Sequence, residues 1–305
     1  MKVLNFGSLN IDYVYKVHHI VRKGETILSK SLEIYPGGKG LNQSVALGRA
    51  GALVYHAGLI GEDGRFLIDV LNEAAVNTNF VSVSKDGKTG HAIIQNEKGG
   101  DNCIVLYGGT NQSVTQKQIV ETLKAFGAGD ILLLQNEISE LSFLIKAAHA
   151  HGMKIYLNPS PVDDTLKKCP LELIDCFILN KIEAQQLSDL NEDDESVILA
   201  RLIKKYPKAR FVMTLGECGS IYSDGRETIR QGIYRTEIVD TTAAGDTFTG
   251  YFIAGEITGF PVKKSLDIAA QASSIAVSLS GASVSIPKRE EIISYSPIAF
   301  FENMI

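Results

Sequence analysis

The residue types best suited to chemistry in this chain lie in one short segment, 240–250, which reads Asp-Thr-Thr-Ala-Ala-Gly-Asp-Thr-Phe-Thr-Gly. A strand-like stretch, 236–239, precedes it and an apolar helical pattern follows, so the segment is expected to open a helix. The small residues Ala243, Ala244 and Gly245 leave the first backbone amides of that helix uncovered. Such amides have no partner within the helix and sit at the positive end of its dipole, which suits phosphate or another oxyanion.

A carboxylate, Asp246, follows these amides directly. Phosphoryl transfer to an alcohol needs a base that accepts the alcohol's proton and donors that stabilise the transferred group. Asp246 could be that base, and the amides of Ala244 and Gly245 could be those donors. A plain strand-to-helix turn in which Asp246 caps the helix explains the same letters, so the segment alone leaves both interpretations open.

A glycine-rich segment, 36–43, reads Pro-Gly-Gly-Lys-Gly-Leu-Asn-Gln and precedes another helical pattern. It is not a phosphate-binding P-loop, because the Lys-Ser/Thr ending is missing. Its glycines permit close backbone approach to a ligand, and Lys39 and Asn42 are donors suited to sugar hydroxyls. Asn10 and Asp12 alternate after the first strand and can point to one side, as a receptor for vicinal hydroxyls requires. In isolation, an ordinary turn is the favoured interpretation of each segment.

Three further segments combine small or polar residues at the ends of predicted elements. Asn180 and Glu183 could hold Mg²⁺ through water, or could form a capping box at a helix start. The segment 214–219 could lie against a nucleotide, although hairpin turns look similar. The small residues of 276–285 offer hard oxygen ligands that could hold a monovalent cation near Asp240, and a tight loop explains them too.

The order of elements indicates how these residues are positioned. Short apolar runs alternate with amphipathic helical stretches, which predicts a parallel sheet covered on both faces. The predicted strands are 2–6, 131–135, 154–157, 176–179 and 210–215, and the predicted helices include 142–150 and 196–205. Because ligands of open α/β sheets bind beyond the carboxyl ends of the strands, the polar residues at those ends are expected to converge. They are Asn158, Asn180, Thr214 and Asp240.

Four segments early in the chain have a different pattern. The stretches 11–17, 31–35, 91–95 and 103–107 alternate apolar and polar residues, as half-exposed strands do. They predict a small sheet that projects from the main one, as a lid or a dimer surface. An edge extension of the main sheet is the alternative.

Composition excludes some classes of protein. The 305 residues are 45% hydrophobic and 21% charged, with a net charge of −5, which argues against a general nucleic-acid or anionic-membrane surface. No apolar run approaches the length of a membrane span, and the N-terminus does not look like a signal peptide. The four scattered cysteines predict free, buried thiols in a reducing cytoplasm.

Taken in this order, the segments resemble the ribokinase-like carbohydrate kinases, also called the PfkB family. The resemblance rests on 37–43 and 240–248, with 158–161 and 180–183 between them, and it covers the chain from Gly7 to about Glu291. It implies one α/β domain over 1–305, with a mostly parallel central sheet, helices on both faces and a small β-sheet lid. The lid is formed by segments at about 11–36 and 89–108. The implied activity is ATP-dependent phosphorylation of a sugar's primary hydroxyl, giving ribose 5-phosphate from D-ribose.

The resemblance also implies a role for each candidate residue. Asp246 corresponds to the catalytic base, with Ala244 and Gly245 supplying the anion-hole amides. The positions that correspond to sugar ligands are Asn10, Asp12, Gly38, Lys39, Asn42 and Glu137. Those that correspond to the nucleotide and magnesium-water motifs are Asn180, Glu183, Thr214, Gly216, Gly219 and Gln271. Those that correspond to a potassium loop are Asp240, Thr242, Ala276, Leu279, Gly281 and Ser285. ATP, Mg²⁺ and K⁺ are the implied cofactors.

The chain departs from the family pattern at a few positions. Leu41 is larger than the alanine common in ribokinases, and Thr249 and Thr242 replace a common asparagine and an aliphatic residue. Fructose, another ketose or a nucleoside are the alternative substrates, and a non-catalytic sugar-binding regulator is the alternative from another class. A nicotinamide-dependent dehydrogenase fits least, because the Gly7 turn lacks the dinucleotide spacing. A homodimer through the lid in the cytoplasm, with no nucleic-acid or membrane partner, is expected.

Overall fold

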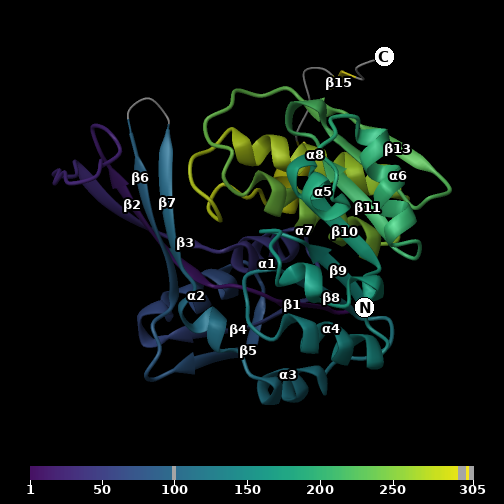
Figure 1. Cartoon of the computed structure of the whole chain (residues 1–305), viewed down its shortest axis with the longest axis horizontal. Coiled ribbons are helices and arrows are strands. Elements are labelled where there is room, and N and C mark those ends of the chain that lie inside the picture. Colours follow the sequence, from purple (N-terminus) through teal and green to yellow (C-terminus); the bar gives the residue numbers. More distant parts are fainter. Residues whose placement is uncertain (98–100, 295–299, 302–305) are drawn as a thin grey trace.

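The computed structural model describes residues 1–97, 101–294 and 300–301, and its largest element is a nine-stranded sheet (Figure 1). A parallel block of strands makes up most of it, and two antiparallel strands complete one edge. In sheet order the strands are β13 (Thr228–Gln231), β12 (Ser220–Ser223), β11 (Arg210–Thr214), β10 (Cys176–Asn180), β9 (Lys154–Asn158), β8 (Ile131–Gln135), β1 (Val3–Phe6), β4 (Val54–Gly61) and β5 (Asn77–Ser84). The mostly parallel central sheet predicted from the sequence is confirmed.

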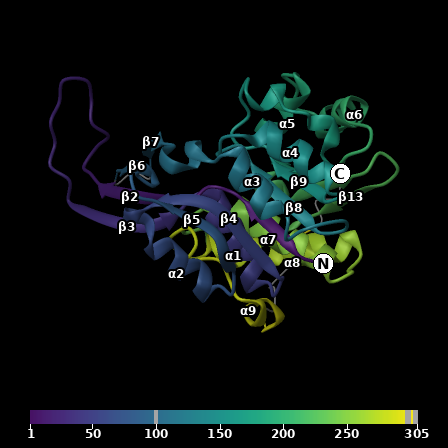
Figure 2. The same ribbon diagram turned by 90° about the horizontal axis from the view of Figure 1, so that it is seen from below.

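Helices cover both faces of this sheet, which explains why its central strands are mostly apolar. Successive side chains of a strand face opposite sides, so Leu132 packs in one apolar core and Leu133 in the other. One face carries α3 (Gln116–Leu123), α4 (Leu141–Ala150), α5 (Lys181–Ser188) and α6 (Glu195–Lys205) (Figure 2). The other carries α1 (Lys39–Arg49), α2 (Phe66–Glu73), α7 (Ala244–Ile257), α8 (Val262–Val277) and α9 (Arg289–Ser294).

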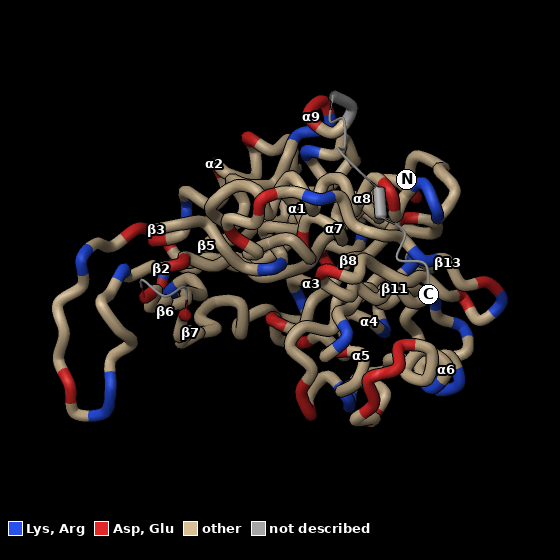
Figure 3. Tube along the Cα trace, turned by 90° about the horizontal axis from the view of Figure 1, so that it is seen from above, with Lys and Arg blue, Asp and Glu red and all other residues tan. Residues whose placement is uncertain are grey.

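A separate four-stranded sheet contains the four alternating segments. Its order is β3 (Ser31–Gly37), β2 (Asn10–Lys16), β6 (Gly90–Asn96) and β7 (Asn102–Tyr107). These strands pair with one another and not with the nine-stranded sheet, so the small sheet is confirmed and the edge extension is wrong. The connection 17–30 between β2 and β3 extends away from the body and carries side chains of both charges (Figures 2 and 3).

The remaining elements are short. They are η1 (Glu62–Gly64), η2 (Gly109–Ser113), η3 (Leu166–Lys168), η4 (Leu171–Leu173), η5 (Gly216–Cys218), β14 (Ile233–Tyr234) and β15 (Phe300–Phe301). None of the helices in the described ranges has the length and apolarity needed to span a membrane.

Two sequence-based expectations are wrong. The stretch 236–239 is not a strand, because the amides of Val239 and Asp240 donate to the carbonyl of Val277 at the end of α8 rather than to a neighbouring strand. Val239 is exposed, so burial does not favour a strand there either. The cysteines are free, but Cys176 is buried while Cys103 and Cys218 are exposed.

The contact between α1 and α7 brings the two signature segments together. Gly250 makes this contact close, since a Cβ at that position would lie 2.4 Å from Cβ of Ala46 and 2.9 Å from the backbone nitrogen of Leu47. The first turn of α7 therefore lies beside the first turn of α1. This packing places residues of the late motif next to residues of the glycine-rich motif.

Candidate active site

A cavity of about 230 Å³ lies where β9, β10 and β11 end and α7 begins. Parallel strands present their carboxyl ends at one edge of a sheet, which is where ligands bind in folds of this class. The cavity is lined by Lys39, Asn158, Ile178, Leu179, Asn180, Glu183, Thr214, Thr241, Ala243, Gly245, Asp246 and Thr249. Six of the predicted site residues are thus brought together around one space.

The N-terminus of α7 forms one wall of this cavity. Ala243 precedes the helix with a φ of 59°, and no side chain caps the helix start. In the described part of the chain, the N–H groups of Gly245 and Asp246 have no hydrogen-bond acceptor, whereas Ala244 donates to the carbonyl of Thr241 at 3.3 Å. The open amide end is therefore present, with Gly245 freer to bind an anion than Ala244.

The carboxylate of Asp246 is buried at the edge of the cavity and is held by two amide groups of α1. Asn42 Nδ2 donates to Oδ2 at 3.0 Å, and Gln43 Nε2 donates to Oδ1 at 2.9 Å. Asp246 is only 8% exposed, yet it borders the cavity, so it faces the cavity rather than bulk solvent. It does not cap its own helix, which removes the plain-capping interpretation of this residue.

Of the predicted sugar ligands, Lys39 lines the cavity and Asn42 bonds to Asp246, whereas Asn10, Asp12, Gly38 and Glu137 lie outside the cavity lining. The backbone amide of Lys39 donates to Glu137 at 3.2 Å, and the hydroxyl of Ser8 also donates to Glu137. Asn10 is buried on β2, where its side-chain oxygen accepts from Asn111 at 2.7 Å. Glu137 therefore links the segment just before β2 to the start of α1.

The glycines of the early motif leave room for these groups. Gly38 precedes α1 with a φ of 91°, a backbone conformation that favours glycine. A Cβ on Gly37 would lie 2.1 Å from Oδ2 of Asp12, so only glycine leaves this carboxylate in its present place.

Burial and mutual repulsion shift the pKa values of the carboxyl groups near the sugar motifs. Burial, and then the charge of Glu137, raise the pKa of Asp12 to about 6, and burial likewise raises the pKa of Glu137. Burial alone would lower the pKa of Lys39, but the charges of Asp246, Glu137 and Glu183 raise it above its ordinary value. Lys39 is thus a half-buried cation among three carboxyl groups, at the junction of the sugar motif and the cavity.

The Asn180–Glu183 pair shows both features considered from the sequence. Asn180 and Glu183 form a capping box at the start of α5, with bonds of 2.8 and 3.0 Å, and both residues also line the cavity. The carboxylate of Glu183 lies 3.5 Å from Nδ2 of Asn158. Capping therefore fixes this carboxylate at the cavity wall instead of removing it from the site.

The other residues predicted to bind the nucleotide do not all line the cavity. Thr214 lines the cavity at the end of β11, and Gly216 has a φ of 58° with open space around it. Gly219 serves strand packing, since a Cβ there would lie 2.0 Å from the carbonyl oxygen of Gln231. Gln271 lies on α8 outside the cavity lining and donates to Asp267 at 3.2 Å.

The predicted cation loop is joined to the α7 turn by Asp240. Its Oδ1 accepts from the amide of Thr242 at 2.9 Å, and its Oδ2 accepts from the amide of Gly281 at 3.0 Å. Burial opposes ionisation, but these hydrogen bonds hold the pKa of Asp240 below its ordinary value. Among the others, Ala276 and Ser285 are buried and Leu279 is exposed. In the described ranges, no cluster of three or more histidine, cysteine or acidic side chains could hold a metal ion.

Comparison with known proteins identifies the family. The model of the pfkB family carbohydrate kinases matches residues 1–289. This chain belongs to that family. The predicted enzyme class, a phosphotransferase with an alcohol group as acceptor, is confirmed with it.

Relatives agree in sequence and in structure. Ribokinases of Haemophilus influenzae and Bacillus subtilis are each 32% identical to this chain, covering 95% and 94% of it and 96% of their own lengths. The solved structure of Arabidopsis thaliana ribokinase with ribose and ATP matches with a TM-score of 0.85 at 28% identity, over 97% of this chain and 99% of that one. Ribokinase from Cryptococcus neoformans var. grubii with ADP matches with a TM-score of 0.83 at 31% identity, over 96% and 98%.

Of the three departures from the family pattern, Thr242 is exposed, and the other two lie in different places. Leu41 is fully buried in the core between the sheet and α1, so its larger side chain adds apolar packing beneath the glycine-rich turn. Thr249 lines the cavity, and its hydroxyl donates to the carbonyl of Gly245 at 2.8 Å. Thr249 therefore alters the surface of the site, and Leu41 does not.

Several residues of this site have no role that the sequence predicts. Gln43 holds Asp246, Ser8 holds Glu137, and Asn111 holds Asn10. The sequence gives no local signal for any of these bonds, because each partner is more than a hundred residues away along the chain.

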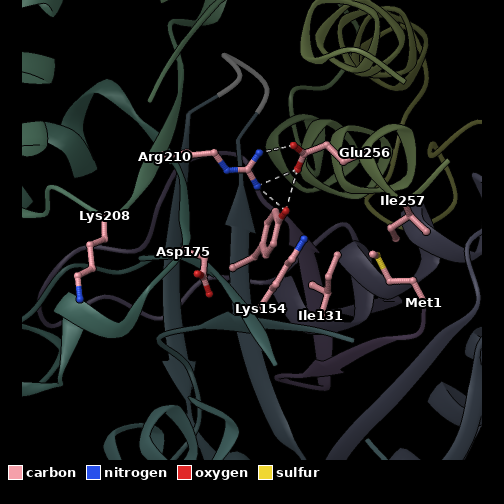
Figure 4. A pocket seen from close by; sticks show the side chains of 9 residues that line it. Met1, Ile131, Lys154, Asp175, Lys208, Arg210, Glu256 and Ile257 are labelled. Carbon is pink, nitrogen blue, oxygen red and sulfur yellow. Dashed lines mark hydrogen bonds and ion pairs between the residues drawn. The ribbon is translucent and has the colours of Figure 1, made fainter. Parts of the chain in front are cut away.

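A larger cavity, of about 290 Å³, lies at the opposite, amino ends of the strands (Figure 4). Its polar groups bind one another: Arg210 forms an ion pair with Glu256 at 2.5 Å and donates to the hydroxyl of Tyr156 at 2.6 Å. Tyr156 in turn donates to Glu256 at 2.9 Å. These bonds attach the C-terminal end of α7 to β9 and β11, so we assign this cavity a structural role.

Proposed function

We propose that this chain is an ATP-dependent ribose kinase that transfers the γ-phosphate to the primary hydroxyl of D-ribose, giving ribose 5-phosphate. One observation carries the proposal: the buried carboxylate of Asp246 borders a cavity beside the open amide of Gly245. The similarity to a ribokinase solved with ribose and ATP, and to another solved with ADP, supports the choice of substrates.

In the proposed mechanism, Asp246 accepts the proton of the primary hydroxyl as that oxygen attacks the γ-phosphate. The amides of Asn42 and Gln43 keep the carboxylate aimed into the cavity. The free amide of Gly245 and the half-buried cation of Lys39 stabilise negative charge on the transferred group.

Ribose is expected to bind between the start of α1 and the small sheet. The side chains that would hold its hydroxyls are Asn10, Asp12, Lys39, Asn42 and Glu137, with Gly38 allowing close approach of the backbone. The small sheet would act as a lid over this part of the site and exclude water, which limits ATP hydrolysis.

The residues present also fit the two ions that the family resemblance implies. Glu183 offers a buried carboxylate at the cavity wall, a hard oxygen ligand suited to Mg²⁺ and its waters. Asp240 draws the 240–242 turn and the Gly281 loop together, and the backbone carbonyls of these two segments are the hard oxygen ligands that K⁺ would take. When bound, Mg²⁺ would neutralise phosphate charge and K⁺ would order the loop beside the anion hole.

The same proposal includes a homodimer in the cytoplasm, formed through the small sheet. The whole of β7 is exposed although it is largely apolar, and Ile34 of β3 is 54% exposed. Exposed apolar strands of this kind are suited to pairing with a second copy of the chain.

A panel of acceptors tests the proposed function. ADP release from ATP and Mg²⁺ is measured with ribose, fructose, another ketose and nucleosides, with and without K⁺. The proposal expects sugar-dependent release, with the highest kcat/KM on ribose. A higher kcat/KM on a ketose or a nucleoside would assign the enzyme to that substrate, and no acceptor-dependent release would indicate a sugar-binding regulator.

A further inference from the structure

Polar side chains form a row across the centre of the otherwise apolar sheet. In the order of the strands they are Asn158 on β9, Gln135 on β8, Asn5 on β1 and His56 on β4. Gln135 is the register partner of Asn158, and Asn5 is the register partner of His56. Gln135, Asn5 and His56 are at most 1% exposed. Buried polar groups are costly unless they are hydrogen-bonded, so the row calls for an explanation.

Hydrogen bonds join the row to α1 in a fixed direction. Asn5 Nδ2 donates to the hydroxyl oxygen of Ser44 at 2.8 Å, and that hydroxyl lies 2.8 Å from Nδ1 of His56. Burial lowers the pKa of His56 to about 4, so its ring is neutral and Nδ1 can accept a hydrogen bond from the Ser44 hydroxyl. Gln135 Nε2 donates to Oδ1 of Asn5 at 3.0 Å and to Oε1 of Gln43 at 2.6 Å.

The row ends on the carboxylate of Asp246 through one side chain. Gln43 is fully buried, and its Nε2 donates both to Oδ1 of Asp246 at 2.9 Å and to Oδ1 of Asn158 at 3.0 Å. Asn158 uses its own Nδ2 on the carbonyl of Ile178 at 3.0 Å, which leaves its oxygen for Gln43. Gln135 donates to Oε1 of Gln43, while Asp246 and Asn158 both accept from Nε2. The Gln43 amide can therefore satisfy these neighbours in one orientation only.

We propose that Gln43 is a positioning residue for phosphoryl transfer, and that the polar row from Asn158 to His56 fixes its amide so that the NH₂ group always faces Asp246. The inference rests on the proposed function of Asp246 as the base. A flipped or missing amide would leave Oδ1 of Asp246 without its donor. Asn42 would then hold the carboxylate through Oδ2 alone, and the carboxylate could rotate away from the acceptor hydroxyl.

Replacing the amide by a side chain of similar size tests the role in turnover. In Gln43→Met we expect kcat to fall by about 10- to 100-fold, because displacements of about 1 Å at reacting groups have effects of this size. KM for ATP should change less than about threefold, since Gln43 is not part of the cavity lining. Gln231→Met is the matched control: Gln231 is buried on β13, and its amide donates to the neighbouring Gly232.

A charge change gives a readout that a purely structural role would not move. In Gln43→Glu, a carboxyl oxygen replaces the nitrogen 2.9 Å from Asp246. A protonated carboxyl can still donate, but two carboxylates so close resist ionising together. The ratio of mutant to wild-type kcat should therefore fall by about tenfold between about pH 6 and about pH 9, and recover when the pH is lowered. Lys39 and Glu137 lie near Asp246 in both proteins, so the wild-type profile contains their contribution and the ratio isolates that of residue 43.

Crystal structures of wild type and Gln43→Met separate this inference from the proposed function. A rotated Asp246 carboxylate with kcat reduced as above supports the inference. An Asp246 carboxylate unmoved in Gln43→Met, a kcat within twofold of the Gln231→Met control, or a pH-independent ratio for Gln43→Glu would each overturn it. If the wild-type chain releases no ADP with any acceptor, the proposed function is overturned instead. The position of Asp246 in the two crystal structures then still decides whether Gln43 holds its carboxylate.

Discussion

The raised pKa of Asp12 predicts that ribose binding by the proposed kinase depends on pH in the weakly acidic range. Burial, and then Glu137, raise the pKa of Asp12 to about 6. The ionised form accepts hydrogen bonds from sugar hydroxyls more strongly than the neutral form, so ribose should prefer the ionised form. With this pKa, about nine-tenths of the group is ionised at pH 7 and about one-tenth at pH 5. KM for ribose is therefore expected to rise by about tenfold from pH 7 to pH 5.

Initial rates at saturating ATP, measured between pH 5 and pH 8, test this expectation. Asp12→Asn is the matched variant, since its amide is neutral at every pH in that range. It should show a raised KM for ribose at pH 7 and a much weaker dependence on pH. The pKa of Glu137 is raised too, so the two carboxyl groups titrate together and broaden the transition. A wild-type KM that is constant from pH 7 to pH 5, or an Asp12→Asn variant that keeps the full slope, would refute the reasoning.

The same shift has a consequence for stability with a definite sign. The pKa of Asp12 is higher in the folded chain than its ordinary value of 3.8, so between about pH 4 and about pH 6 the folded state binds more protons than the unfolded state. The contribution of Asp12 to the free energy of unfolding therefore falls as the pH rises through this window. Ribose, by binding the ionised form, should raise the melting temperature more at pH 7 than at pH 5.

Three substitutions test other parts of the site. Asp246→Asn removes the base, so kcat should fall by about 10²- to 10⁴-fold while calorimetry finds ATP binding largely unchanged; an active variant would exclude the base role. Gly37→Ala places a Cβ 2.1 Å from Oδ2 of Asp12, so KM for ribose should rise by about tenfold with KM for ATP unchanged. An unaltered KM for ribose would show that Asp12 tolerates displacement. Glu256→Gln weakens the ion pair at the far end of α7, so urea denaturation should show a loss of about 1–3 kcal/mol in the free energy of unfolding. A fall in kcat without a loss of stability would contradict the structural role of this pair.

The sequence predicted the elements whose periodicity is strong and whose burial is complete. The strands at 131–135 and 176–179 are almost wholly apolar because helices cover both faces of the sheet, and the structure contains both. The stretch 236–239 contains the β-branched residues Thr236, Ile238 and Val239, but it pairs with no strand in the described part of the chain, and pairing partners cannot be recognised from local pattern.

The candidate site likewise contains residues that the sequence identifies and residues that it does not. Asp246 and Glu183 could be selected because each stands at a strand-to-helix junction, which is a local feature. The role of Gln43 depends on a bond to Asn158, 115 residues away, and on the packing of α1 against α7. Gln271 was selected by resemblance alone, and its bonds to neighbouring side chains of α8 and β14 lie outside the cavity lining.

The arrangement of α1 and α7 explains how the proposed base can lie so far in the sequence from the proposed sugar motif. Asn42 and Asp246 are 204 residues apart, yet their side chains bond at 3.0 Å because the two helices meet closely at Gly250. The donors that orient the base thus belong to the helix that begins in the proposed sugar-binding loop. A displacement of that loop would disturb the base as well as the sugar ligands. This shared support ties proton transfer to an ordered sugar site, which is the condition under which ATP should be spent on the sugar rather than on water.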